Sequence, residues 1–482
     1  MSDEYSIVMY HGEFNKSRCG YCKKENTCNS HGMTAHVMAV NDYQDLIDRG
    51  WRRSGTFCYK PTNATTCCPS YTIRCDALNF KLSKSHKKIL KRMNKFLRDG
   101  IKECGEKESA HDGESDVASE PQMIPPASAT KIDISKIVNK LPKGSDRPPS
   151  ESAHKVEPSQ AMESGDSLPR SAGQNMSKPP CKKAKVLRLE RKQAKMAQRE
   201  AEGISVQPLA KAPKNVEKSL EDFLGEQPVD GKHKLKIKLV CATSREFLSS
   251  VEREYELYQK YQTVIHREPP EDVDEFQSFL QHSPLQLKLN STSPPKGYGS
   301  FHQQYWLDDR LIAVGVIDVL RNCVSSVYLF YDPEFSFLSL GTYSSLREIA
   351  FMRELQKSCP ELKYYYMGFY IHSCPKMRYK GKLQPSYLLC PEVYTWHLIT
   401  EDLLKKLDRS KYSRFNEDEQ ARDKDEFQLR HLESVVCLYD NTIMYFEDYI
   451  HLHAGDEERR LTLEYGRLVG SPCSRRILLY KN

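Results

Sequence analysis

The 482 residues are enough for roughly three domains, but 28% of them are charged, which indicates that part of the chain does not pack into a core. No run approaches the roughly 20 apolar residues of a membrane helix, and the N-terminus lacks a signal-peptide pattern. We therefore expect a soluble intracellular protein that has no membrane partner. The net charge of +7 is modest over this length, so its distribution is more informative than its sum.

Residues 1–100 are predicted to form a small cysteine-rich domain. The domain ends in a basic segment, residues 84–98, in which lysines and arginines surround a stripe of apolar residues. The apolar residues at helical spacing are Ile89, Met93, Phe96 and Leu97. Gly100 follows the segment and suits the C-terminal cap of a helix. The pattern predicts an amphipathic helix with a cationic surface.

Residues 101–228 are predicted to be a long disordered linker, because Ser, Glu, Pro, Lys and Gly dominate and prolines interrupt any period. Within it, a basic tract at 182–195 is long enough to become helical against a polyanion. The tract is also compatible with a nuclear-import signal or an unengaged tail. We expect the protein in the cytoplasm and the nucleus.

Residues 229–482 are predicted to be the second folded part. Strict alternation over 233–240 predicts a half-buried strand, and 246–266 has a helical pattern. Two extended runs follow within 305–319, around a polar turn at Asp308, and a third apolar run covers 324–331. The next helix is expected to start near Ser345, because Ser345 and Glu348 have capping-box spacing, and 364–370 predicts another strand.

The order strand, strand, strand, helix, strand resembles the core of the GNAT acyltransferases. That family normally holds the pyrophosphate of coenzyme A on backbone N–H groups of an Arg-x-x-Gly-x-Gly turn that opens the central helix. Here the corresponding segment, 336–341, keeps only the last glycine, Gly341. We therefore predict an α+β protein with a GNAT-like catalytic domain, a metal-binding N-terminal domain, and an acyl donor other than acyl-coenzyme A.

Sixteen cysteines in a chain without a signal peptide favour metal ligation or simple burial over disulfides. Cys19 and Cys22 form a pair with two intervening residues, and Cys67 and Cys68 form an adjacent pair. Zinc and iron–sulfur clusters both prefer thiolate ligands. An adjacent pair is unlike an ordinary zinc ribbon, so the metal stays open, and redox-sensing or buried thiols are the alternatives. Other nearby residues could substitute as ligands or be ordinary buried side chains: Cys28, Cys58, Cys75, His31 and His36.

Longer segments in both folded parts resemble the eukaryotic arginyl-tRNA–protein transferases. They are residues 19–22, 43–55, 66–74, 297–306 and 364–380. The resemblance implies transfer of arginine from arginyl-tRNA to proteins with N-terminal Asp, Glu or oxidised Cys, which marks them for ubiquitin-dependent degradation in the N-degron pathway. It also implies that Cys19, Cys22, Cys67 and Cys68 hold the metal and that the catalytic part is GNAT-like.

Transfer from an aminoacyl ester needs no nucleophilic side chain, because the ester is already activated. It needs positioning, hydrogen bonds to the developing oxyanion, and a proton acceptor for the attacking ammonium. We assign His302 or His372 as the proton acceptor, and Ser300, Gln303 and Gln304 as orienting or oxyanion groups. The structural alternative for each histidine is an ordinary hydrogen-bonded side chain.

Asp332 is predicted to bind the arginine guanidinium, because a carboxylate offers it a bidentate partner. Asp332 precedes a proline, so a simple turn is the alternative. The other predicted substrate-binding residues are the tyrosines of the two neighbouring strands and the cations available for an acidic acceptor side chain: Tyr328, Tyr331, Tyr370, Lys376, Arg378, Lys380, Arg52 and Arg53.

Arginyl-tRNA is predicted to bind the helix at 84–98 and the tract at 182–195, because an acceptor stem is read largely through phosphates and 2′-hydroxyls. Two other functions fit parts of the pattern. A coenzyme A-dependent N-acetyltransferase would use the same sheet, and a non-catalytic metal-bearing RNA-binding protein would use the cysteines and the basic segments.

Overall fold

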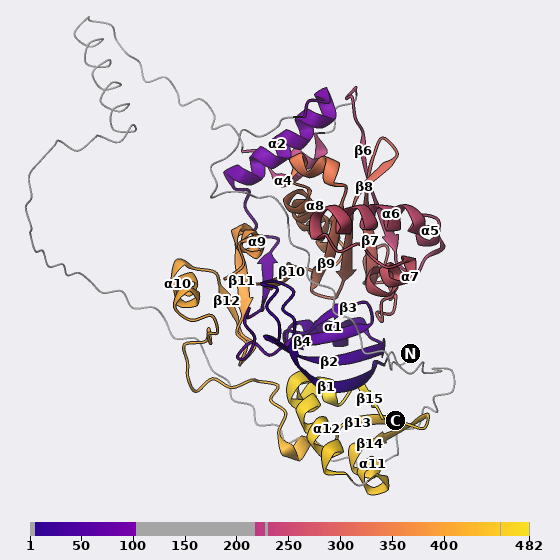
Figure 1. Cartoon of the computed structure of the whole chain (residues 1–482), viewed down its shortest axis with the longest axis vertical. Coiled ribbons are helices and arrows are strands. Elements are labelled where there is room, and N and C mark those ends of the chain that lie inside the picture. Colours follow the sequence, from indigo (N-terminus) through magenta and orange to yellow (C-terminus); the bar gives the residue numbers. More distant parts are fainter. Residues whose placement is uncertain (1–4, 103–216, 227–229, 454, 482) are drawn as a thin grey trace, which may run out of the picture. The chain divides into compact units, whose positions relative to one another are not determined.

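The computed structural model describes residues 5–102, 217–226, 230–453 and 455–481 (Figure 1). Apart from residues 217 and 218, these lie in one compact unit made of Met1–Pro142 and Ser219–Asn482. Most of the predicted linker, including the basic tract at 182–195, lies outside the described residues. No helix in the described ranges is both long enough and apolar enough to cross a membrane.

The larger sheet of the described residues has eight strands, in the order β12-β11-β5-β10-β9-β8-β7-β6. Their bounds are β5 Tyr71–Asp76, β6 Leu235–Cys241, β7 Gly299–Leu307, β8 Arg310–Val319, β9 Cys323–Tyr331, β10 Tyr364–Tyr370, β11 Ser386–Leu389 and β12 Trp396–Leu398. All neighbours are antiparallel except β9 and β10, which are parallel. The predicted strand order around the hairpin is confirmed, with Asp308 and Asp309 at positive φ in its turn.

The parallel pair β9 and β10 is short. Tyr364, Tyr365 and Tyr366 of β10 are in register with residues 323–325 of β9, and no pairing is found between the later residues of these two described strands. On its other side, β10 pairs with β5 from Tyr364 to Tyr370. The two strands therefore separate towards their C-terminal ends, while β5 supports β10 along its whole length.

The second sheet of the described residues has seven strands, in the order β14-β13-β15-β1-β2-β4-β3. Their bounds are β1 Ile7–Ser17, β2 Cys28–Val37, β3 Arg52–Ser54, β4 Phe57–Pro61, β13 Val436–Tyr439, β14 Thr442–Tyr445 and β15 Leu478–Tyr480. β1 pairs in parallel with β15, so the two ends of the described chain meet in this sheet.

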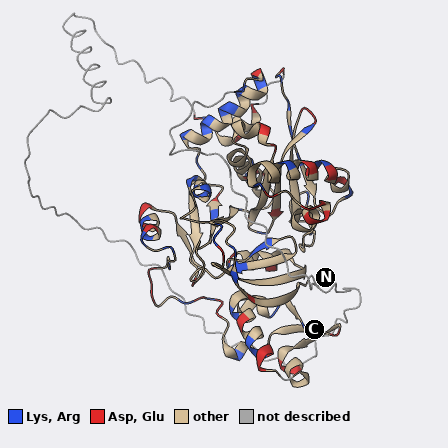
Figure 2. Cartoon of the chain, viewed as in Figure 1, with Lys and Arg blue, Asp and Glu red and all other residues tan. Residues whose placement is uncertain are grey.

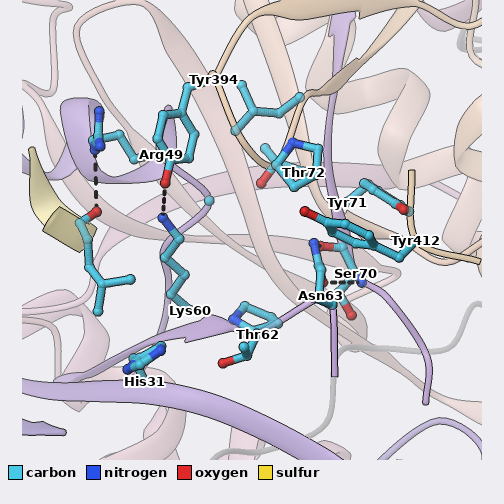
Figure 3. Close-up of a pocket in the computed structure, with 16 residues that line it drawn as sticks. His31, Arg49, Lys60, Thr62, Asn63, Ser70, Tyr71, Thr72, Tyr394 and Tyr412 are labelled. Carbon is cyan, nitrogen blue, oxygen red and sulfur yellow. Dashed lines mark hydrogen bonds between the residues drawn. The ribbon is translucent and has the colours of Figure 1, made fainter. Parts of the chain in front are cut away.

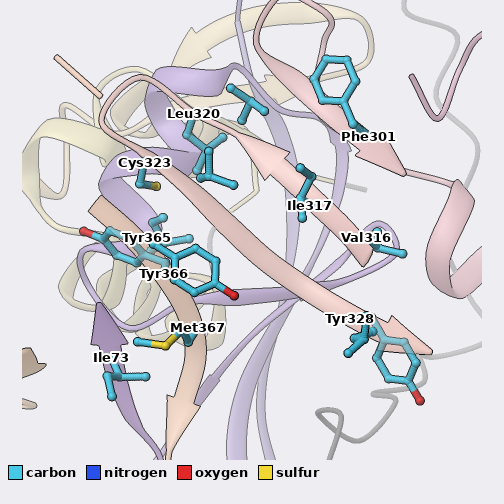
Figure 4. Packing of buried hydrophobic residues seen from close by; sticks show 14 of the residues in the cluster. Ile73, Phe301, Val316, Ile317, Leu320, Cys323, Tyr328, Tyr365, Tyr366 and Met367 are labelled. Carbon is cyan, nitrogen blue, oxygen red and sulfur yellow. The ribbon is translucent and has the colours of Figure 1, made fainter. Parts of the chain in front are cut away.

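The structure differs from the prediction of separate folded parts at 1–100 and 229–482, because those two segments share both sheets. β5 lies between β10 and β11, and β1 lies beside β15. Ile73 of β5 packs in the same core cluster as Tyr365 and Met367 of β10 (Figure 4). Pairing between strands far apart in sequence leaves no local signal, so the sequence pattern could not show this exchange.

The helices of the described residues cover the sheets and connect their strands. Their bounds are α1 Val40–Ile47, α2 Lys84–Asp99, α4 Leu220–Gly225, α5 Arg245–Leu248, α6 Val251–Tyr261, α7 Val273–Phe276, α8 Leu340–Gln356, α9 Pro375–Arg378, α10 Glu401–Arg409, α11 Phe446–Leu452, α12 Asp456–Val469 and α13 Ser471–Ser474. α6 packs against β8 and β9, and α8 packs against β9 and β10. α8 also contacts α2 and α4.

The predicted basic helix is confirmed as α2. Ser83 caps its N-terminus, and Gly100 ends it in the left-handed conformation with φ of 68°. Its four predicted apolar residues are all buried. The end of the predicted linker is ordered instead, because Ser219 and Asp222 form a capping box for α4, which buries Leu220, Phe223 and Leu224.

The predicted start of the central helix is wrong. α8 begins at Leu340, after Ser339, and its N-cap makes no side-chain hydrogen bond. The Ser345 hydroxyl donates to the carbonyl of Gly341 inside the helix, and Glu348 is buried in the core. The spacing of a capping box therefore arose by chance between two residues that both face inward.

Candidate metal centre and polar groups of the central sheet

The four predicted metal ligands come together. The Sγ atoms of Cys19, Cys22, Cys67 and Cys68 all lie within 4.8 Å of one another. Cys19 and Cys22 lie on a turn in which the N–H of Lys23 donates to the carbonyl of Cys19 at 2.9 Å. Four convergent thiols are a suitable donor set for a soft metal ion, so these cysteines are candidate metal ligands.

The cysteine quartet contacts the segment that follows β10. Cys19 and Cys68 are buried in one cluster with Ile371 and Met377. The second cysteine pair also lies directly before β5, which pairs with β10. A metal at the quartet would therefore hold the C-terminal end of β10 from two directions, through β5 and through the apolar contacts of residues 371–377.

His372 lies at this end of β10 with two partners. Its Nδ1 is 2.9 Å from the hydroxyl of Tyr370, and its Nε2 is 2.7 Å from Oδ1 of Asp408 on α10. The Nε of Arg378 donates to the His372 carbonyl at 2.8 Å. Three predicted site residues are thus brought together, and Asp408 is a partner that the sequence did not indicate.

His302 is fully buried, and both of its ring nitrogens are engaged. Nδ1 is 2.5 Å from Oε2 of Glu254, and Nε2 is 3.1 Å from the carbonyl of Leu280. Gln304 donates to Oε1 of the same Glu254 at 2.7 Å, so both β7 residues face α6. This is the hydrogen-bonding of a buried structural histidine, and Glu254 is the partner that sequence reasoning missed.

Gln303 faces the opposite side of the sheet, because successive strand residues alternate. Its Oε1 accepts a hydrogen bond from Tyr305 at 2.6 Å. It is in register with Gly315, where an added Cβ would lie 3.0 Å from Oε1 of Glu348 on α8. Gln303 and Gln304 therefore do not serve one site from the same face.

Ser300 and Arg53 meet in a buried ion-pair cluster. Arg53 binds Asp318 in bidentate fashion, with Nε to Oδ2 at 2.8 Å and Nη2 to Oδ1 at 2.6 Å. The Ser300 hydroxyl donates to Oδ1 of Asp318 at 2.6 Å. Arg52 donates to the backbone carbonyls of Ile47, Trp51 and Gly368. Both arginines thus tie β3 to the larger sheet.

Asp332 already has two cationic partners, Lys260 at 2.8 Å and Arg310. Its Oδ1 also accepts from the N–H of Glu334, as expected of the turn alternative. The neighbouring tyrosines are engaged, since Tyr328 accepts from Gln262 at 2.9 Å and the Tyr331 ring packs at a tilt against that of Tyr261, with ring centres 5.0 Å apart.

The remaining predicted cations lie near the end of β10. Lys380 is buried, and its Nζ donates to the carbonyl of Phe369 at 3.0 Å, whereas Lys376 is exposed on α9. The predicted site residues therefore occupy separate groups. Their catalytic and substrate-binding roles stay predictions.

Glu348 is a buried acid that sequence reasoning assigned to a helix cap. Burial raises its pKa to about 7, against hydrogen bonds from Tyr365 and Ser326 that lower it. Its Oε2 has no hydrogen-bond partner among the described residues. A carboxyl in this state destabilises the folded chain when it ionises.

We predict that Glu348→Gln makes the folded chain more stable and that this gain grows as the pH rises. Below about pH 4.5 the carboxyl is protonated in both the folded and the unfolded chain. As the pH rises to about 7, the carboxyl ionises in the unfolded chain first, because its pKa is lower there. The free energy of unfolding of the wild type therefore falls by roughly 3 kcal/mol relative to that of the variant. Urea unfolding at about pH 5 and about pH 8 measures the difference. Glu354→Gln on the exposed face of α8 is the control, and an equal effect of both variants at the two pH values would contradict the account.

Comparisons with known proteins show which family the chain resembles. Family models described as "Arginine-tRNA-protein transferase, N terminus" and "C terminus" match residues 17–88 and 253–390. The chain is 48% identical over 490 residues to arginyl-tRNA–protein transferase 1 of Drosophila melanogaster, with 99% of each chain covered. It is 37% identical over 454 residues to arginyl-tRNA–protein transferase 2 of Arabidopsis thaliana, with 79% of this chain and 73% of the relative covered.

A shorter match reaches a bacterial enzyme. Over 138 residues the chain is 33% identical to an aspartate/glutamate leucyltransferase of Acinetobacter baumannii, which covers 28% of this chain and 44% of the relative. The full-length match to the Drosophila protein and the two family models identify the lineage of the whole chain. The chain belongs to the arginyl-tRNA–protein transferase family.

Proposed function

We propose that this protein is an aminoacyltransferase that moves arginine from arginyl-tRNA to the N-terminal α-amine of other proteins and so marks them for ubiquitin-dependent degradation. The observation that carries the proposal is 48% identity to an arginyl-tRNA–protein transferase along 99% of both chains. We place the activity in the cytoplasm and the nucleus.

The acceptors we propose begin with Asp, Glu or oxidised Cys. The match to an aspartate/glutamate leucyltransferase supports an acidic acceptor. The name of that relative gives aspartate and glutamate together with a different transferred amino acid, and 138 of its residues align with this chain. Asp, Glu and oxidised Cys all present a negative charge close to the reacting amine. One cationic subsite near the end of β10 would therefore serve the whole group.

We infer a GNAT-like catalytic core that does not use coenzyme A. The order β7, β8, β9, α8, β10 and the early separation of the parallel strands β9 and β10 support this inference. A 3-10 turn, Pro333–Leu338, fills the segment before α8 and buries Phe335 and Leu338. Apolar side chains thus occupy the region where a glycine-rich turn would expose its backbone N–H groups.

His372 is our candidate for the proton acceptor, because it is partly exposed at the end of β10, while His302 is enclosed. The acceptor's ammonium must lose a proton before its nitrogen attacks the ester carbonyl of arginyl-tRNA and the ribose oxygen leaves. The partner carboxylate of Asp408, 2.7 Å from Nε2, would orient the imidazole and stabilise it when it is protonated. The hydroxyl of Tyr370, which is hydrogen-bonded to Nδ1, would relay the proton to His372 or donate a hydrogen bond to the developing oxyanion.

We propose that the cysteine quartet holds zinc or an iron–sulfur cluster. The mutual spacing of all four sulfurs below 4.8 Å favours a single tetrahedral ion, in which neighbouring sulfurs lie about 3.8 Å apart. A cluster would place several irons and sulfides between them. The metal would stabilise the contact between Cys68 and the residues after β10.

Arginyl-tRNA is proposed to bind along α2, where lysines and arginines recur along the whole helix (Figure 2). One surface hollow is lined entirely by this helix, through Lys84, Lys87, Lys88, Lys91, Arg92 and Lys95. Such a stripe suits the phosphates of an acceptor stem, which are read by charge. The tract at 182–195 is proposed as a second contact and lies outside the described residues.

The function is tested by incubating the protein with labelled arginine, tRNA, arginyl-tRNA synthetase and a peptide that begins with Asp. We expect labelled peptide that depends on the protein and is lost when the tRNA is digested with RNase beforehand. Acetyl-coenzyme A in place of the tRNA system tests the acetyltransferase alternative. Label in the peptide at the rate seen without the protein would refute the proposal.

Neutralising α2 is predicted to weaken tRNA binding. The triple variant Lys84→Gln, Lys88→Gln, Lys91→Gln should raise the KM for arginyl-tRNA roughly tenfold or more at physiological salt and make that KM less dependent on salt, with the peptide KM unchanged. The control is Arg430→Gln, Arg459→Gln, Arg475→Gln, an equal charge change at exposed positions of the C-terminal part. Equal KM values for the two triple variants would contradict α2 as the tRNA surface.

Removing one ligand is predicted to empty the metal centre. After anaerobic purification, Cys22→Ser and Cys67→Ser should lose most of the zinc or iron found in the wild type by elemental analysis, whereas Cys241→Ser on β6 should retain it. A visible absorption band that accompanies iron would identify a cluster, and colourless zinc would identify the single ion. Unchanged metal content in both ligand variants would place the metal elsewhere.

A further inference from the structure

A pocket that none of the predicted site residues line lies beside β4 and β5 (Figure 3). Its volume is about 220 Å³, and its walls come mainly from β4, β5, the loop between them and the turn after β11, with further lining residues on β2, on α12 and in the loop after α1. Thr72 of β5 lines it and is in register with Phe369 of β10, three residues before His372. The pocket is therefore adjacent to the end of β10, where we place the acceptor's amine.

Lys60 carries the positive charge of this pocket. Its Nζ donates to the Tyr394 hydroxyl at 2.6 Å, and no carboxylate in the described part of the chain binds it. Burial lowers the pKa of its ammonium. Burial takes hydrating water away from the Lys60 ammonium, and an anion in the pocket would give it a charged hydrogen-bond partner in place of that water.

The second cation in the wall is already compensated. Arg49 binds Asp423 through two hydrogen bonds of 3.1 and 2.6 Å, and its guanidinium lies 4.1 Å from the centre of the Tyr394 ring. None of the 16 lining residues, all within the described ranges, is Asp or Glu. The lining therefore presents an excess of positive charge from Lys60.

Thr72 adds an unused hydrogen-bonding group. Its side chain is 2% exposed, and its Oγ1 has no hydrogen-bond partner in the described residues. A Cβ built on Gly50 would lie 3.9 Å from this Oγ1 and 4.0 Å from Cε of Lys60. The hydroxyl and the lysine thus border the same small space. A buried hydroxyl without a partner costs stability unless a ligand supplies one.

The backbone that supports the pocket is strained at Tyr394, whose φ is 54°. A left-handed conformation is unfavourable for a bulky side chain, and such residues cluster at binding sites. Here the strained turn places the tyrosine ring against both cations, at 4.1 Å from Arg49 and 4.5 Å from Lys60. It thereby holds Lys60 with its ammonium towards the pocket.

We propose that this pocket binds the side-chain carboxylate of the acceptor's N-terminal Asp or Glu, with Lys60 as the cation and Thr72 as a hydrogen-bond donor. The inference rests on the proposed function and assigns its acceptor subsite. The arginine of the donor fits poorly, because its guanidinium would meet Lys60 and Arg49. RNA phosphates are bound by exposed cations, whereas this lysine is half-buried in the wall of a small pocket.

The sharpest test is Thr72→Val, which removes only the unpartnered hydroxyl and keeps the side-chain shape. We expect unchanged or slightly higher thermal stability, because no internal hydrogen bond is lost. For a peptide that begins with Asp we expect kcat/KM to fall roughly threefold to tenfold, with an unchanged KM for arginyl-tRNA. Thr442→Val, at an exposed position of β14, is the matched control.

Lys60→Met tests the charge at nearly constant volume. We expect its kcat/KM for the Asp peptide to fall roughly tenfold to a hundredfold, and its preference for Asp over the isosteric Asn peptide to disappear. Thr72→Val decides the matter if Lys60→Met does not fold.

Two other outcomes would overturn the assignment while leaving the proposed function intact. In the first outcome, the wild type is active and the folded Lys60 and Thr72 variants keep its kcat/KM for the Asp peptide and its preference for Asp. The other is a rise in the KM for arginyl-tRNA in place of the peptide. A wild-type protein that transfers no arginine would instead refute the proposed function.

Discussion

The backbone pairing of β5 with β10 and β11 is the constraint on which the rest of the structure depends. β5 comes from the N-terminal hundred residues, yet it occupies the interior of the larger sheet, where both of its edges are hydrogen-bonded. Without it, β10 and β11 would each present an open edge to solvent. The cysteine-rich N-terminal part and the later part of the chain therefore fold as one structure.

This pairing also brings the functional candidates together. The loop before β5 carries Cys67 and Cys68, and β5 itself carries Thr72. On the neighbouring strand β10, Tyr370 is in register with Tyr71, the residue before Thr72, and His372 follows two residues later. The candidate metal ligands, the proposed carboxylate pocket and the proposed proton acceptor thus share one supporting element.

A buried ion pair reinforces the connection between the two parts. Arg53 of β3 and Asp318 of β8 are almost completely enclosed and bound in bidentate geometry. Such a pair adds little stability compared with apolar residues, but the loss of one partner leaves an uncompensated charge in the core. The pair therefore specifies how β3 docks on the larger sheet.

The amino-acid sequence by itself determined the local elements and the family. Helical spacing defined α2, alternation and a polar turn defined the hairpin of β7 and β8, and the cysteine pairs indicated the candidate metal ligands, because each signal lies within a few neighbouring residues. Only the tertiary structure decided that the N-terminal part supplies β5, that His302 is enclosed by Glu254, and that Lys60 and Thr72 border one pocket. These relations depend on pairing and burial between residues far apart in the chain, for which no local period exists.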